Sequence, residues 1–199
     1  RFVLPRAAKQ NTLPKRRKMF RQKTIESEAV FLCGFITGEM EKPLVIGKAS
    51  NPRCFKNINK RNLPVEWQSN KKAWMTSQLM EEWLIAFNGR MKQQGRHVLL
   101  FLDNATCHPH ITLSNVKLAW FPPNTTSVCQ PMDQGVIKCF KVNYRKLLMR
   151  FLLGHMETSS SATELAKNIS VLDEVVWIAE SIKHLHKQSA SVFAKQGFP

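Results

Sequence analysis

The chain is poor in acidic residues, in tyrosine and in long apolar runs. Its 199 residues include 14 Asp and Glu against 30 Lys and Arg, and a single Tyr. No run reaches the roughly 18 apolar residues that a membrane-spanning helix needs. We therefore expect no membrane partner.

Paired cysteines are also lacking. The five cysteines are odd in number and scattered, and none forms a Cys-x-x-Cys pair. This excludes a disulfide framework and favours reduced thiols in an intracellular protein. Cys107-His108-Pro109-His110 contains zinc-ligand types, but they are crowded and lack a distant second pair. A structural zinc is the weaker alternative here.

The scarcity of acids leaves a formal charge of +16 and a pI near 10.0. Such an excess favours a polyanionic partner, and DNA is the one we expect. Residues 1–23 form a basic arm without an acid, and its Lys15-Arg16-Arg17-Lys18 cluster predicts phosphate contacts and a nuclear location. Further predicted DNA contacts are Lys71, Lys72, Lys138, Lys141 and Arg145. The alternative is a basic interaction module without nucleic-acid chemistry.

The apolar periodicity predicts a mixed-sheet α/β domain. A hairpin is expected over residues 29–47, a polar loop over 50–72 with a short strand near 65–67, and a helix over 76–94 that ends at Gly95. Two strands follow at 98–102 and 116–121, then helices at 133–153 and 179–196. Trp74 and Trp83 are predicted to be core residues.

The strand over residues 98–102 organises the rest. Its five consecutive apolar residues predict a strand buried on both faces, with Asp103 at the carboxyl end, where α/β sheets place ligands. Asp133 opens the helical pattern that follows. Two such carboxylates, expected roughly 4–8 Å apart, form a candidate metal site. The alternatives are an Asx turn at Asp103 and a helix cap at Asp133.

Several segments carry a family resemblance. In order they are Lys42-Pro43-Leu44-Val45-Ile46-Gly47-Lys48, Asn70-Lys71-Lys72-Ala73-Trp74-Met75, Asp103-Asn104-Ala105-Thr106-Cys107-His108-Pro109, Pro122-Pro123-Asn124-Thr125-Thr126-Ser127 and Gln130-Pro131-Met132-Asp133-Gln134-Gly135. Together they resemble the DDE catalytic domain of Tigger/pogo-type transposases, a group that includes jerky-like proteins and centromere protein B.

The resemblance implies a ribonuclease-H-like mixed sheet flanked by helices, with its first strand expected before Arg1. It also implies that Asp103 and Asp133 are the second and third catalytic carboxylates and hold two Mg²⁺ (or Mn²⁺) ions. Asn104, His108 and Gln134 would be their neighbours. Because the family's first Asp precedes the positions that match Arg1–Pro5, we expect residues 1–199 alone not to nick DNA.

We expect residues 1–155 to form the catalytic-like domain, 156–164 a linker, and 165–199 a helical extension of the same domain. Two functions of this kind stay open, a metal-dependent DNA endonuclease or transposase and a domesticated, inactive DNA- or chromatin-binding relative. Self-association as a homo-oligomer also stays open.

Overall fold

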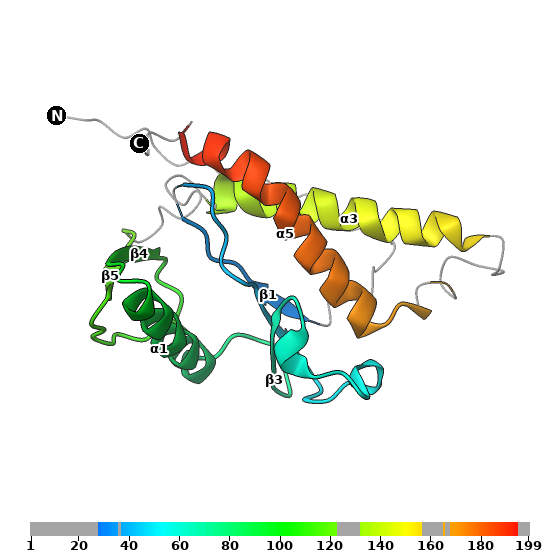
Figure 1. Cartoon of the computed structure of the whole chain (residues 1–199), viewed down its shortest axis with the longest axis horizontal. Helices are drawn as coiled ribbons and strands as arrows, with labels where there is room; N and C mark the ends of the chain where they lie inside the picture. The colour runs from blue at the N-terminus through cyan, green and yellow to red at the C-terminus, as the bar shows by residue number, and fades with distance from the viewer. Residues whose placement is uncertain (1–27, 36, 123–131, 157–164, 166–167, 195–199) are drawn as a thin grey trace, which may run out of the picture.

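The computed structural model describes residues 28–35, 37–122, 132–156, 165 and 168–194. Strands β1 (Ala29–Phe31), β2 (Leu44–Gly47) and β3 (Glu66–Ser69) form one sheet, and β4 (Val98–Leu102) and β5 (Val116–Trp120) form another. The long helices are α1 (Ser77–Gln93), α3 (Ile137–Gly154) and α5 (Val171–Ala194) (Figure 1). None of these described helices combines the length and apolar character required to cross a bilayer.

The predicted hairpin is confirmed. β1 and β2 pair antiparallel with Val30 opposite Val45, and Gly38 in the connection adopts a φ of 89° that favours glycine. β3 adds to β2 in parallel, so the order is β1-β2-β3. The short strand expected near 65–67 is therefore present, and short 3₁₀ turns at Arg53–Phe55 and Lys60–Asn62 precede it.

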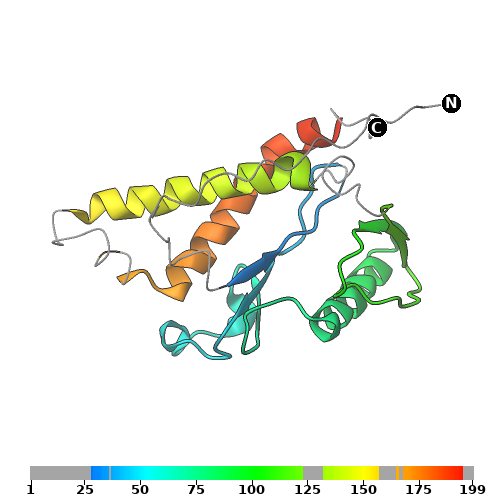
Figure 2. The same cartoon turned by 180° about the vertical axis from the view of Figure 1, so that it is seen from behind.

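Strand β2 is the strand that is buried on both faces. Val45 points into a cluster of buried side chains from α3 and α5, whereas Leu44 and Ile46 point into a second cluster with α1. This follows from the two-residue period of a strand. The three-stranded sheet therefore has helices on both of its faces, and Figure 2 shows α3 and α5 on one side and α1 on the other.

Helix α1 forms as predicted. Its buried residues recur at spacings of three and four: Met80, Trp83, Leu84, Phe87 and Met91. Thr76 caps the beginning of the helix by accepting a hydrogen bond from the Leu79 N–H at 3.3 Å. At the other end Gly95 has a φ of 66°. Arg90 anchors the helix to the sheet through Glu41 and Glu66, each at 3.2 Å.

The two predicted core tryptophans differ. Trp83 is 4% exposed and stacks on Phe87 at 5.0 Å between ring centroids, which confirms the core prediction. Trp74 is 69% exposed, so the same prediction for it was wrong. The reason is its place in the loop before Thr76, outside the apolar stripe of α1.

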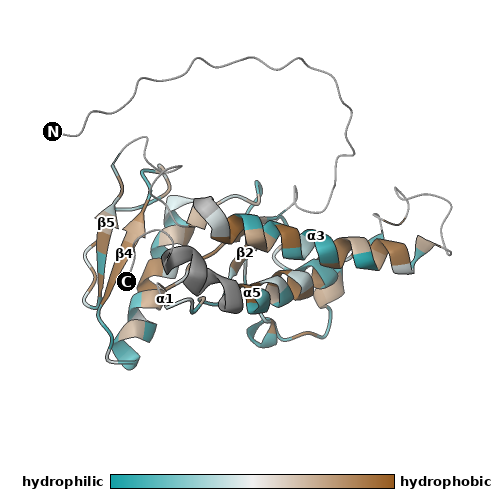
Figure 3. Cartoon of the chain, turned by 90° about the horizontal axis from the view of Figure 1, so that it is seen from above, coloured by the Kyte–Doolittle hydropathy of each residue, from teal (hydrophilic) through white to brown (hydrophobic). Residues whose placement is uncertain are grey.

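Strands β4 and β5 pair in parallel, with Leu102 opposite Trp120. The prediction that β4 is buried on both faces was wrong, because Leu99 is 51% and Phe101 43% exposed. Helix α1 covers one face, where Leu102 and Val116 are buried. Within the described residues the opposite face is covered in part by the stacking of Phe101 on Phe121. Figure 3 shows these apolar strands beside α1.

Helix α3 follows a π-helical turn over Met132–Val136 and buries Phe140, Tyr144 and Leu148, close to the predicted span. Helix α5 begins at Val171, eight residues before the expected start at Ala179. A reciprocal cap explains this start, because Ser170 N donates to Asp173 Oδ2 at 3.0 Å and Asp173 N to Ser170 Oγ at 3.2 Å. Its first apolar residues pack on α3.

The α/β class is therefore confirmed. Within the described residues, β1–β3 and β4–β5 form separate sheets. The single mixed sheet of a ribonuclease-H-like fold and the proposed domain limits stay predictions.

Candidate active site

Asp103 lies directly after the last residue of β4. Parallel strands end at the same edge of a sheet, so the carboxyl ends of β4 and β5 meet there. The backbone confirms this meeting point, since Phe121 N donates to Leu102 O at 2.9 Å. The Asp103 side chain is 28% exposed. A half-buried carboxylate at this edge is accessible to a ligand and partly shielded from water.

The Asp103 carboxylate is fixed through one of its oxygens. Oδ1 accepts the Ala105 N–H at 3.2 Å, which is the Asx turn considered above. His108 Nδ1 lies 3.0 Å from the same Oδ1 and 2.9 Å from the Asp103 carbonyl oxygen. Because both neighbours are acceptors, Nδ1 carries the proton. Within the described residues, no hydrogen bond or ion pair engages Oδ2.

The groups around Asp103 are themselves held in place. The Asn104 side chain donates from Nδ2 to the Phe121 carbonyl at 2.6 Å, which links the loop to the end of β5. The His108 side chain is only 10% exposed and lies near the Trp120 ring, with 6.2 Å between centroids. Asn104 and His108 thus both stabilise the Asp103 loop, and their role as active-site neighbours stays a prediction.

The surroundings of Cys107 do not favour a reactive thiolate. Its partial burial raises the pKa of the thiol, and the nearby Asp103 charge raises it further, so the thiolate is disfavoured. Among the described residues no three His, Cys, Asp or Glu side chains converge in a way that could hold a metal. The crowded Cys107–His110 segment consequently gains no support as a zinc site.

Asp133 and Gln134 lie in the π-helical turn before α3. Asp133 is inside this turn, and Val136 occupies the N-cap position of α3 without a side-chain hydrogen bond. The side chains of Asp133 and Gln134 lie outside the described residues, so the expected Asp103–Asp133 separation stays a prediction. In Figures 1 and 2 the beginning of α3 is the end nearer to β4 and β5.

The predicted DNA-contacting side chains that are described lie on the surface. Lys71 and Lys72 are exposed in the turn after β3. On α3, Lys138, Lys141 and Arg145 are exposed at spacings of three and four, so they share one face of the helix. The Lys15–Lys18 cluster lies outside the described residues.

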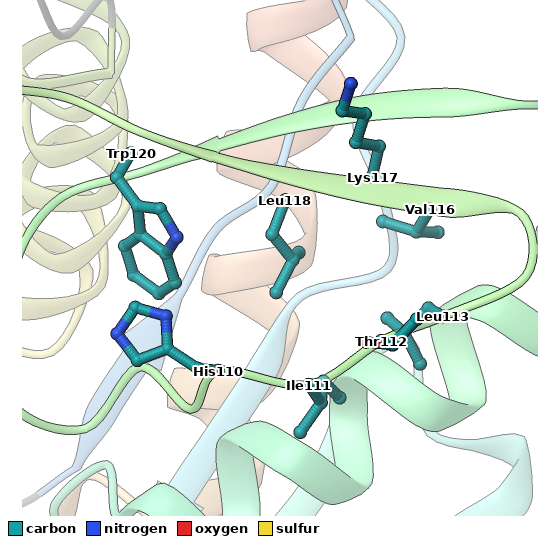
Figure 4. A pocket seen from close by; sticks show the side chains of 8 residues that line it. All are labelled: His110, Ile111, Thr112, Leu113, Val116, Lys117, Leu118 and Trp120. Atoms are coloured by element: carbon teal, nitrogen blue, oxygen red, sulfur yellow. The ribbon is translucent and has the colours of Figure 1, made fainter.

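Two hollows lie near the Asp103 loop. One, of about 650 Å³, is lined by Ala29, residues 74–77 and residues 105–107. The other, of about 490 Å³, lies beside β5, and Figure 4 shows the His110 and Trp120 side chains facing each other there. Neither hollow has a carboxylate in its lining, so neither suits a hard metal ion by itself.

Trp74 and the larger hollow were missed by sequence reasoning. Asn70, four residues before Trp74, could have indicated this loop in the sequence, because Asn side chains form hydrogen bonds that stabilise tight turns. An Asn-built turn would have predicted an exposed loop residue.

Comparison with known proteins decides the family. A family model described as DDE superfamily endonuclease matches residues 26–191. The chain belongs to this family. The resemblance found in the sequence is thereby confirmed.

Relatives of this DDE chain include transposon-derived and centromere proteins. Tigger transposable element-derived protein 4 of Mus musculus is 38% identical over 66% of the chain. CENP-B homolog protein 2 of Schizosaccharomyces pombe is 33% identical over 76%, and major centromere autoantigen B of Homo sapiens 32% over 65%. The matches cover 25%, 31% and 21% of these relatives' own lengths, respectively. No solved structure matches the chain.

Proposed function

We propose that this DDE chain binds DNA and forms part of an endonuclease site in which Asp103 and Asp133 hold a divalent metal beside a phosphodiester. The observation that carries the proposal is the fixed Asp103 carboxylate at the carboxyl end of β4. The finer fold that supports it is a ribonuclease-H-like arrangement of the two sheets. In that arrangement the carboxyl end of β4 and the beginning of α3 would face the same point.

The residues at this point suit Mg²⁺ or Mn²⁺. Hard cations prefer carboxylate oxygens, and Asp103 keeps Oδ2 clear of the contacts that fix Oδ1. When bound, two such ions supply an activated water and neutralise charge on the phosphate oxygens. His108 and the Ala105 N–H hold the carboxylate in one orientation, and Asn104 holds the loop against β5. Gln134 lies in the same turn as Asp133 and is proposed as a neighbour.

The surface supports a nucleic-acid partner. Exposed lysines lie after β3 and along one face of α3, and the whole chain carries a charge of +16. Phosphate neutralisation by such side chains supplies most sequence-independent affinity. With the Lys15–Lys18 cluster and the centromere names among the relatives, a nuclear location forms part of the proposal.

A second candidate function is DNA binding without cleavage. It is favoured by the relatives named for binding or for a centromere, such as ARS-binding protein 1 of Schizosaccharomyces pombe. The first candidate function requires a bound metal ion and the second does not, whereas both use the same DNA contacts.

The test measures Mn²⁺ binding to the chain through its effect on the relaxation rate of water protons. We expect Asp103→Asn and Asp133→Asn each to weaken Mn²⁺ binding more than about tenfold, because each removes a ligand charge. His108→Ala should weaken it about tenfold, since groups that orient a ligand typically contribute 10- to 100-fold. Asp173→Asn is the matched control, because Asp173 caps α5 rather than the site. Mn²⁺ binding that is equal in all four variants would contradict the metal site and leave the second candidate.

A further inference from the structure

Trp74 is a large apolar side chain that is exposed to solvent and that the proposed metal site does not use. It is 69% exposed, the largest exposed fraction among the described large apolar side chains. Single exposed apolar residues are ordinary on protein surfaces. What distinguishes Trp74 is the way in which the loop holds it.

The Asn70 side chain builds the loop that carries Trp74. Its Oδ1 accepts the N–H groups of Lys72 at 3.1 Å and Trp74 at 3.2 Å, and its Nδ2 donates to the Trp74 carbonyl at 2.6 Å. Ala73, between Lys72 and Trp74, is buried and has a φ of 49°, a left-handed conformation that residues other than glycine rarely adopt. These hydrogen bonds hold the loop backbone at Lys72 and Trp74 in one conformation.

The indole lines the 650 Å³ hollow, and another part of its wall belongs to the Asp103 loop. Ala105, Thr106 and Cys107 line that part, directly after Asp103 and Asn104. Ser77 Oγ donates to the Thr106 carbonyl at 3.3 Å and ties the two parts of the wall together. The volume falls within the roughly 300–1,000 Å³ of small-molecule pockets.

We propose that Trp74 is a stacking platform for a nucleobase displaced from the DNA duplex beside the phosphate at Asp103. This rests on the proposed function for its DNA partner and adds the subsite that receives the base. The exposed Lys71 and Lys72 lie in the same loop, three and two residues before Trp74, and contact the phosphates that flank the displaced base. Stacking on an aromatic ring accepts any base, since every base has a π-face. The subsite therefore recognises an unpaired base without reading its identity.

The test compares two DNA probes by fluorescence anisotropy at low salt, using the full chain. One is a plain duplex, and the other is the same duplex with a short unpaired stretch. Trp74→Ala should weaken binding to the unpaired probe about 5- to 100-fold, the effect of losing one stacked base. Binding to the plain duplex should change less than about twofold, because phosphate contacts remain. Trp74→Phe should keep most of the affinity for the unpaired probe.

Ile85→Ala is the matched control, since Ile85 is an exposed apolar residue on α1 outside the hollow. It should leave both affinities unchanged. If wild type binds both probes and Trp74→Ala binds both as wild type does, the stacking platform is wrong and DNA binding stands. If Trp74→Ala weakens both probes equally, the indole has no preference for a displaced base, which also overturns the inference. Failure of wild type to bind either probe would instead defeat the proposed function.

Discussion

Glu174 is a carboxyl group buried inside the packing of α5 against the sheet. Its burial raises the pKa to about 10, and a hydrogen bond that the protonated Glu174 shares with Glu28, together with the negative charge of Glu28, adds to the shift. The side chain is 6% exposed. Tyr144 lies in the same environment, and burial followed by the Glu174 charge raises the pKa of its phenol. The raised pKa favours the neutral form of Glu174 in the folded protein at pH 7.

This gives folding a pH dependence with a defined sign. Because the folded-state pKa of about 10 exceeds the ordinary value of 4.5, the folded chain binds the proton more tightly than the unfolded chain. The stabilisation is complete below pH 4.5 and is lost as the pH rises toward 10, at most about 1.4 kcal/mol per pH unit.

We expect Glu174→Gln to flatten this dependence between pH 5 and 9 and to raise the free energy of unfolding at pH 9. Gln has the shape of the neutral acid and carries no charge to bury. Urea unfolding at several pH values measures it. Glu180→Gln, at an exposed position on the same helix, is the control and should leave the pH dependence unchanged. A variant with the slope of wild type would show that Glu174 is already ionised.

For single residues, the sequence predicted which residues form the candidate site better than it predicted the burial and neighbours of each side chain. Asp103 was selected from its place after an apolar strand and His108 from the family resemblance, and the structure brings the two side chains into contact. The burial of Glu174 could not be foreseen, because a carboxylate near a helix start is normally exposed. Its environment comes from Glu28 and Tyr144, far away in the sequence.

Among the elements, α1 has the clearest local cause. Its limits were predictable because 20 consecutive residues contain the apolar stripe, the N-cap Thr76 and Gly95, just after the end of the helix. The faces of β4 were not, since an apolar run does not state how many layers will cover it. The beginning of α5 was missed because its capping pair, Ser170 and Asp173, follows a stretch of linker composition.

The Thr76 cap provides a stability prediction for α1. We expect Thr76→Ala to lower the free energy of unfolding by about 1 kcal/mol, because the Leu79 N–H loses its acceptor. This corresponds to a fall of roughly 2–4 °C in Tm for a chain of this size. Thr76→Ser keeps the hydroxyl and should stay within a few tenths of a kcal/mol of wild type. Thermal unfolding followed by circular dichroism distinguishes the two, and an equal loss in both variants would contradict the cap.

The whole molecule joins a helix-covered sheet to a strand pair whose far face bears exposed apolar side chains. The α/β class could be predicted from the apolar periodicity, and the family from the ordered motifs. The division of the described strands into two sheets could not, because sheet closure depends on pairing between distant segments. The net charge is also a property of the whole molecule, and it follows from the sequence alone.

That charge predicts how DNA binding responds to salt. The logarithm of the association constant for duplex DNA should fall linearly with the logarithm of the salt concentration, since each neutralised phosphate releases counterions and contributes about −0.9 to the slope. Replacing Lys138, Lys141 and Arg145 together by Ala should reduce the magnitude of the slope by about 3. Lys183→Ala is the control, because Lys183 is exposed on α5 and pairs with Glu180. Anisotropy titrations between about 50 and 200 mM salt measure the slopes. A triple variant that keeps the wild-type slope would remove the α3 face from the DNA interface, and binding that ignores salt would contradict an electrostatic interface altogether.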